Sequence, residues 1–177
     1  MTDEKKINTL LEILSSEQNT LQRADQKAFT MLSLIGVFAV FFIIHYTKIP
    51  PTIVSSVLIF IYFVSVIISI FFLVSVVSPR IKESKAINEE SKNILPTFFG
   101  GIVRYKSAAD YAKELGVILE DDDKTYQVFS KSVYSIGRIN SYKHKYLRYG
   151  ITAFVIAIGV EFIIIIMLYL KLLALQG

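Results

Sequence analysis

Three long runs of apolar residues stand out in the sequence, and each is long enough to cross a lipid bilayer. They cover residues 28–46, 53–77 and 151–170, and a helix of about 20 mostly apolar residues spans the hydrocarbon core. The third run contains one acid, Glu161, near its centre. Its many Ile, Leu, Phe and Val residues outweigh the insertion cost of a single carboxylate. The pattern therefore predicts three membrane-spanning helices.

The polar residues before the first run carry a stripe with heptad spacing. The stripe alternates steps of three and four through Ile7, Leu10, Leu14, Glu17, Leu21, Ala24 and Ala28. This spacing places all seven residues on one helix face, and the stripe enters the first apolar run without a break, so we expect one helix of about 40 residues. Its first part, residues 1–27, would stand outside the bilayer and need a partner for the stripe.

The polar segment of residues 78–149 also has helical patterns. Pro79 fits a helix start, and a polar helix is expected to end before Pro96. The pair Gly100 and Gly101 then marks a loop. Further along, Ser107 and Asp110 form a capping box ahead of a short helix, and Gly116 fits the end of that helix.

A second long helix is expected to begin at the acidic run of residues 120–123, where negative charge favours a helix start. An apolar and aromatic stripe follows on this helix and continues into the third apolar run. It begins with Tyr126, Phe129, Val133 and Ile136, and then shifts to a neighbouring position on the helix with Ile139, Tyr142, Tyr146 and Tyr149. No strand-like alternation of useful length occurs. We predict an all-α membrane protein with three transmembrane helices and long cytoplasmic helical extensions, divided at residues 1–27, 28–77, 78–149 and 150–177.

The composition supports this class and removes others. The chain has 177 residues, of which 53% are hydrophobic and 19% charged, against about 25% charged in soluble domains. The absence of cysteine excludes disulfides, thiolate nucleophiles and cysteine metal sites. The two histidines, His45 and His144, are isolated. We find no enzyme signature, and expect no catalytic residue, no metal site and no cofactor.

The distribution of basic residues predicts the topology. Only Lys48 lies between the first two runs, whereas residues 1–27 hold four Lys or Arg and residues 78–149 hold thirteen. The positive-inside rule then places the N-terminus and residues 78–149 in the cytoplasm and the C-terminus outside. We expect no cleaved signal peptide, because a polar stretch of 27 residues precedes the first run.

Glu161 is the most specific single-residue signal, because a carboxylate in mid-membrane is costly. Tyr62, Ser65 and Ser69 share one face of the second run near the same level, which predicts a polar seam with Glu161. The seam either lines an ion pathway, with Glu161 repeated around an oligomer axis, or holds a protonated Glu161 that donates a hydrogen bond to a hydroxyl of the second run. Both interpretations stay open.

Basic and aromatic residues gather in two places that could bind a phosphate-bearing ligand. One group lies within nine residues of the polar segment and consists of Phe98, Phe99, Arg104, Tyr105 and Lys106. At the mouth of the first run, Arg23 and Lys27 share a helix face, and Asp25 is expected to pair with a base of residues 78–149. The alternative for these bases is that they anchor the chain to anionic lipid.

Four motifs, in order, resemble the Pycsar transmembrane effectors. They are ADQKA at 24–28, FFGGI at 98–102, DYAKEL at 110–115 and KYLRYG at 145–150, and the matching positions include Ala24, Asp25, Lys27, Ala28, Phe98, Phe99 and Gly100. The resemblance implies a bacterial inner-membrane effector of anti-phage defence that responds to cyclic CMP or cyclic UMP from a partner nucleotide cyclase or nucleotidyltransferase. The implied output is membrane impairment, by general disruption or an ion channel, and growth arrest. It assigns no catalytic residue.

A three-span monomer has too few helices to enclose a water-filled path. We therefore expect a symmetric homo-oligomer of two or four subunits in the lipid bilayer, joined through the stripe of residues 7–28. A ligand that reorders the cytoplasmic helices would then move the spans. Two alternatives stay open: a channel kept closed by a bound nucleotide or oligonucleotide and opened on its loss, and a membrane scaffold that binds no small ligand.

Overall fold

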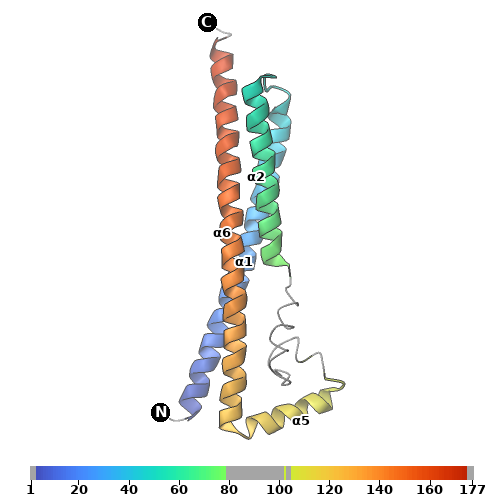
Figure 1. Cartoon of the computed structure of the whole chain (residues 1–177), viewed down its shortest axis with the longest axis vertical. Coiled ribbons are helices and arrows are strands. Elements are labelled where there is room, and N and C mark those ends of the chain that lie inside the picture. The colour runs from blue at the N-terminus through green and yellow to red at the C-terminus, as the bar shows by residue number, and fades with distance from the viewer. Residues whose placement is uncertain (1–2, 79–101, 103–104, 175–177) are drawn as a thin grey trace. The chain divides into compact units, whose positions relative to one another are not determined.

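The structure is a computed structural model that describes residues 3–78, 102 and 105–174. Within these residues the chain forms four α-helices and no strand, in agreement with the predicted all-α fold. They are α1 (Asp3–Tyr46), α2 (Ile53–Val77), α5 (Ala108–Leu119) and α6 (Asp122–Ala174), shown in Figure 1. The predicted helix from Pro79 to Pro96 and the predicted loop at Gly100 and Gly101 lie outside the described residues.

The chain divides into two compact units. The polar unit comprises residues 1–22 and 79–141, and the apolar unit comprises residues 23–78 and 142–177. Helix α2 belongs to the apolar unit and α5 to the polar unit, whereas α1 and α6 contribute residues to both without a break in either helix. The division into four segments made from the sequence stays a prediction.

The stripe predicted on α1 is the face that packs. Its residues up to Leu21 are partly shielded, Ala24 and Ala28 are buried, and most of the residues between them are exposed. In the polar unit Glu17 of the stripe is held by Asn140 of α6. In the apolar unit the two alanines join a core cluster with Leu147 of α6. The stripe therefore contacts α6 within the chain, and the expected pairing of two copies through it stays a prediction.

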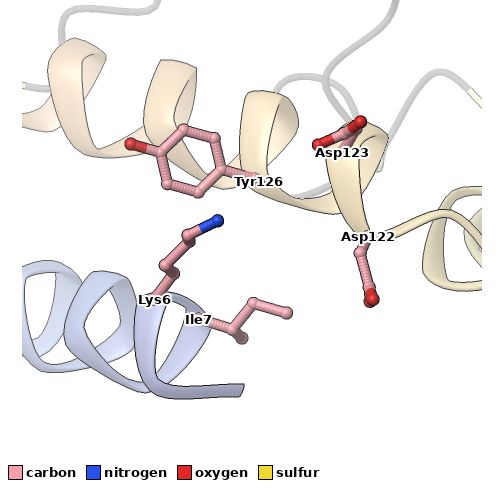
Figure 2. Close-up of a pocket in the computed structure, with 5 residues that line it drawn as sticks. All are labelled: Lys6, Ile7, Asp122, Asp123 and Tyr126. Carbon is pink, nitrogen blue, oxygen red and sulfur yellow. The ribbon is translucent and has the colours of Figure 1, made fainter. Parts of the chain in front are cut away.

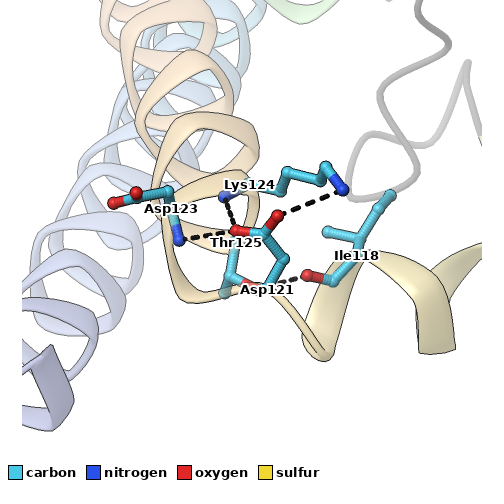
Figure 3. Close-up of polar contacts among 5 residues, drawn as sticks. All are labelled: Ile118, Asp121, Asp123, Lys124 and Thr125. Atoms are coloured by element: carbon cyan, nitrogen blue, oxygen red, sulfur yellow. Dashed lines mark hydrogen bonds and ion pairs between the residues drawn. The ribbon is translucent and has the colours of Figure 1, made fainter.

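Both expected helix starts in the polar unit are confirmed. Ser107 Oγ accepts a hydrogen bond from the Asp110 N–H at 3.1 Å and donates one to Asp110 Oδ2 at 2.9 Å, which caps α5. Before α6, Asp121 Oδ1 accepts from the N–H groups of Asp123 and Lys124, both at 3.1 Å (Figure 3). These bonds satisfy amides that a helix start otherwise leaves without a partner.

The predicted end of α5 at Gly116 is wrong, because the helix continues to Leu119. Gly116 has no positive φ, so its backbone is not in the left-handed conformation that ends many helices. The turn comes later because Ile118 supplies the capping acceptor: its carbonyl accepts from Thr125 Oγ1 at 2.8 Å (Figure 3) and from the Asp121 N–H at 3.3 Å.

The predicted stripe on the first half of α6 is only partly the packed face. Its middle residues Phe129, Val133, Ile136 and Ile139 are partly shielded, but they are not the most buried residues of this half. The buried residues there are small or polar, namely Thr125, Ser132, Ser135 and Asn140. Tyr126 of the predicted stripe is 46% exposed. Burying these hydroxyls is inexpensive because they have acceptors on their own helix: Ser132 donates to the Val128 carbonyl at 3.1 Å and Ser135 to the Lys131 carbonyl at 2.9 Å.

The apolar unit contains a core formed by α1, α2 and α6. One cluster joins Ile35 of α1, Leu73 and Val76 of α2, and Leu147 and Phe154 of α6. A second cluster consists of Phe42, Tyr62, Ala157, Val160 and Ile164. Large apolar side chains also cover the outside of this unit, and α1, α2 and α6 are long and apolar enough to cross a membrane. A lipid-facing surface explains this exposure, and the three predicted spans are confirmed as apolar helices.

Helices α2 and α6 approach closely at Gly150. Ser69 Oγ donates a hydrogen bond to the Gly150 carbonyl at 2.8 Å. A Cβ atom added at Gly150 would lie 2.8 Å from Leu73 Cγ and 3.4 Å from the Leu73 nitrogen. Only glycine fits this contact without displacing Leu73, which is fully buried.

Candidate functional site

Glu161 lies inside the apolar unit rather than on its lipid-facing surface. The residue is only 3% exposed, and both carboxyl oxygens are buried. The Tyr62 hydroxyl is a hydrogen-bond neighbour of the carboxyl group, and the His45 ring acts on it electrostatically. The Tyr62 ring stacks on Phe42 with ring centroids 4.3 Å apart. An intramembrane carboxylate is thus held in the bundle interior next to a fixed phenol.

The four residues of the predicted polar seam fall into two places. Tyr62 lies at Glu161, and Ser65 is buried on the same face of α2. Ser69 bonds instead to Gly150, which precedes Glu161 by 11 residues, or about 16 Å along the helix. The structure therefore does not bring Ser69 to Glu161. The compact candidate site in this unit is Glu161 with Tyr62.

At the start of the apolar unit, Asp25 pairs with a base on α6, as the sequence analysis expected. The Lys143 ammonium donates to Asp25 Oδ1 at 2.5 Å, and the two side chains are 13% and 28% exposed, respectively. Arg23 and Lys27, the other two candidates here, are exposed. Asp25 thus joins α1 to α6, and the two bases lie on the accessible face of α1.

Of the second group of candidates, only Tyr105 and Lys106 are described; Phe98, Phe99 and Arg104 lie outside the described residues. The Tyr105 ring packs edge-on against Tyr111, with ring centroids 5.4 Å apart. Burial, the nearby Glu114 carboxylate and Tyr111 raise the pKa of Tyr105 above its ordinary value. The neighbouring Lys106 is exposed.

Sequence reasoning missed the pairing of Glu17 with Asn140 in the polar unit. Asn140 is 4% exposed, and its Nδ2 donates to the Glu17 carbonyl at 2.9 Å and to Glu17 Oε2 at 2.5 Å. The signal that could have found it is the acid itself. A carboxylate on an otherwise apolar stripe needs a buried donor on the facing helix.

A pocket of about 280 Å³ lies between the first turns of α1 and α6 in the polar unit. Figure 2 shows Lys6 reaching toward the Tyr126 ring, with Asp122 and Asp123 on the α6 side. The fifth lining residue is Ile7. The pocket offers one cation, two carboxylates and an aromatic face, a set that suits a small polar ligand with a planar group. The sequence analysis attributed these acids to the helix start alone.

The cap of α6 gives a pH-dependent prediction. Hydrogen bonds from the Lys124 N–H and the Lys124 side chain hold the pKa of Asp121 below its ordinary value. The charged form therefore stabilises the fold above the unfolded-state pKa of about 3.9, and this contribution is lost as the pH falls through the lower folded value. In an NMR titration, Asp121 is expected to titrate below an unfolded reference peptide. Lys124→Ala is expected to raise the titration midpoint of Asp121 only part of the way to that of the reference peptide, because the backbone N–H donors remain. An ordinary midpoint in the folded protein would contradict the cap.

Comparison with protein families assigns the chain to a known family. The Pycsar effector protein domain matches residues 9–171, a range that includes α2 and α5 and most of α1 and α6. No curated protein and no solved structure matches the chain in the corresponding comparisons. The match spans both units, so Glu161 and most of the two helices shared between the units lie inside the family domain. This chain belongs to the Pycsar effector protein family, a family of anti-phage defence effectors.

Proposed function

We propose that this protein is a non-catalytic bacterial inner-membrane effector that binds a nucleotide second messenger and then permeabilises the membrane. The messenger is of the cyclic CMP or cyclic UMP type and comes from a partner nucleotide cyclase. The N-terminus and the polar unit face the cytoplasm, where the messenger is made, and the C-terminus faces the periplasm. Family membership and the three apolar helices support this assignment.

The observation that carries the proposal is the continuity of α1 and α6. Each helix supplies residues to the polar unit and to the apolar unit, with no break at residues 22–23 or 141–142. A change in the polar unit therefore has no flexible linker in α1 or α6 to absorb it before the apolar unit. Such a connection suits a protein in which binding outside the bilayer controls the arrangement of helices within it.

The pocket lined by Lys6 and Tyr126 supports a nucleotide site in the polar unit. Its volume of about 280 Å³ is close to the lower end of the range for small-ligand sites, about 300 Å³. The Tyr126 ring offers a stacking face for a pyrimidine, and Asp122 and Asp123 supply acceptors for the free ribose hydroxyl or the cytosine amino group. Lys6 is the one cation among the described lining residues and partly offsets the two carboxylates.

The proposed output involves Glu161. A buried carboxylate is costly in the closed bundle, and its cost falls when water reaches it. Rearrangement of α1 and α6 would expose Glu161 and Tyr62 to an aqueous path and favour cations. Two or four copies are needed to enclose such a path. Because the α1 stripe is packed within the chain, they would meet through exposed apolar faces of the apolar unit.

Proteoliposomes loaded with a fluorescent dye test the proposal directly. Cyclic CMP or cyclic UMP is expected to start leakage, and cyclic AMP serves as the control. Tyr126→Ala is expected to raise the half-maximal nucleotide concentration by roughly 5- to 100-fold, the range for losing one base–aromatic stack. Tyr134→Ala is the matched control, because Tyr134 is strongly exposed and does not line the pocket.

Three outcomes would contradict parts of the proposal. Leakage that occurs without nucleotide and stops when nucleotide is added would mean that the nucleotide closes the protein instead of opening it. Leakage indifferent to every nucleotide would remove the sensor. An unchanged half-maximal nucleotide concentration for Tyr126→Ala would mean that the nucleotide does not bind in this pocket. The proposed membrane function would not be affected by that result.

A further inference from the structure

Three Lys or Arg residues lie close together where α6 enters the apolar unit, and only one of them is used for packing. Lys143 is 13% exposed and pairs with Asp25 of α1. Lys145 and Arg148 are exposed, and no hydrogen bond or ion pair joins either side chain to another residue in the described part of the chain. Two cationic side chains are therefore available to bind a ligand.

Lys145 and Arg148 begin a continuous exposed face of α6. Steps of three and four residues keep to one side of a helix, and from Arg148 they lead through the exposed residues Thr152, Ile156, Gly159 and Ile163. The Thr152 hydroxyl donates to the Arg148 carbonyl at 2.9 Å, so it can face hydrocarbon at little cost. The face therefore carries positive charge at one end and suits hydrocarbon along the rest.

Tyr149 places an aromatic ring where the charged end of this face meets the apolar part. The residue is 46% exposed, and its ring lies beside Phe72 of α2 with ring centroids 5.3 Å apart. Tyrosine is enriched at membrane–water interfaces because its ring is apolar and its hydroxyl is polar. Tyr149 therefore indicates that Lys145 and Arg148 lie at the level of the lipid headgroups.

We propose that Lys145 and Arg148 form a binding site for an anionic phospholipid. The lipid phosphate lies on the ammonium and guanidinium groups, and the Tyr149 hydroxyl donates to the headgroup. An acyl chain lies along the face of α6 that begins at Thr152. The KYLRYG motif of residues 145–150 thus binds lipid. The site requires neither a nucleotide signal nor a pore.

The apolar part of this face selects a lipid over other ligands that carry phosphate. A guanidinium binds phosphate bidentately and an ammonium adds a point charge, so the two bases alone would suit any phosphate. A nucleotide or inorganic phosphate has no hydrocarbon to place beyond Thr152. A phospholipid carries phosphate and hydrocarbon in the same order as the face of α6. Each base near a bilayer surface is expected to contribute about fivefold to the preference for an anionic lipid.

The experiment uses the full chain in bilayers without nucleotide. The sequence contains no tryptophan, so one introduced tryptophan reports which lipid lies next to it, through quenching by brominated acyl chains. Ile156→Trp places this reporter on the proposed path of the acyl chain, about 12 Å from Arg148 along α6. Dibrominated phosphatidylglycerol and dibrominated phosphatidylcholine are the two probes. The ratio of their association constants is measured.

Ile67→Trp is the matched reporter on α2. Ile67 is 65% exposed, and both isoleucines lie six residues beyond the contact of Leu73 with Gly150, so the two reporters have the same depth. Each reporter is combined with Lys145→Gln and Arg148→Gln, which remove the proposed site.

A second pair of substitutions controls for total charge. Lys113→Gln with Lys131→Gln also removes two exposed charges, but from the polar unit.

At position 156, phosphatidylglycerol is expected to bind about fivefold or more tightly than phosphatidylcholine, and removal of Lys145 and Arg148 is expected to bring the ratio close to one. The ratio at position 67 is expected to stay unchanged, which also shows that the variant is still inserted and folded. The charge control is expected to change neither ratio. Equal binding of the two lipids at position 156 would overturn the proposal. An unchanged ratio without the two bases, an equal fall at both reporters, or an equal fall in the charge control would overturn it as well.

Discussion

Gly150→Ala is expected to destabilise the apolar unit by about 1–3 kcal/mol relative to Gly159→Ala, the range for overpacking a tight core. The added Cβ would lie 2.8 Å from Leu73 Cγ, and Leu73 has no exposed surface through which to move away. The substitution would also press on the hydrogen bond from Ser69 to the Gly150 carbonyl. The free energy of unfolding in mixed micelles measures the effect.

Gly159 provides a matched control on the same helix. A Cβ at Gly159 meets no atom within 4 Å. Both substitutions gain the same helix propensity, about 1 kcal/mol, so the difference between the two variants isolates the contact with α2. Equal unfolding free energies for the two alanine variants would show that α2 and α6 do not approach closely at this level.

Lys143→Ala is expected to lower the free energy of unfolding by about 1–2 kcal/mol, somewhat less than a fully buried charged hydrogen bond because both partners keep some solvent contact. The ammonium of Lys143 is the donor to Asp25 Oδ1. Its removal leaves a carboxylate that is only 28% exposed without that partner. Lys145→Ala, two residues away on the exposed face of α6, is expected to change stability by less than about 0.5 kcal/mol.

A double-mutant cycle separates the ion pair from other effects of the two substitutions. Asp25→Ala with Lys143→Ala is expected to cost less than the sum of the single changes, with a coupling of about 1 kcal/mol. Additive effects would mean that the two side chains do not stabilise the fold as a pair. Coupling would assign Asp25, a residue of the ADQKA motif, to helix packing rather than to direct ligand contact.

The helices and their starts could be predicted because they depend on local patterns. The heptad spacing of residues 7–28, the Ser107–Asp110 box and the acids before α6 are each readable within a few turns of chain. The end of α5 could not be predicted in this way. Gly116 is compatible with a helix interior as well as a helix end, and the choice depends on Thr125, which is contributed by the next helix.

For contacts between helices, the sequence indicated the type of interaction but not which residue on the other helix makes it. Asp25 was expected to pair with a base, and thirteen Lys or Arg residues of the segment 78–149 were available; packing of α1 on α6 selects Lys143. Ser69 was placed at the level of Glu161 by counting from the ends of the runs. The actual register of α2 against α6 is set by Leu73 and Gly150, which no single segment reveals.

The hydroxyl-rich face of α6 has a mechanical consequence. Thr125, Ser132 and Ser135 present no large side chain that could lock into a neighbour. Two of these hydroxyls bond to carbonyls of α6 itself, and those bonds survive if α6 slides along its axis. These two bonds therefore do not fix the register of α6 against α1 in the polar unit. That register depends on the bonds from Asn140 to Glu17, which a slip of α6 would break.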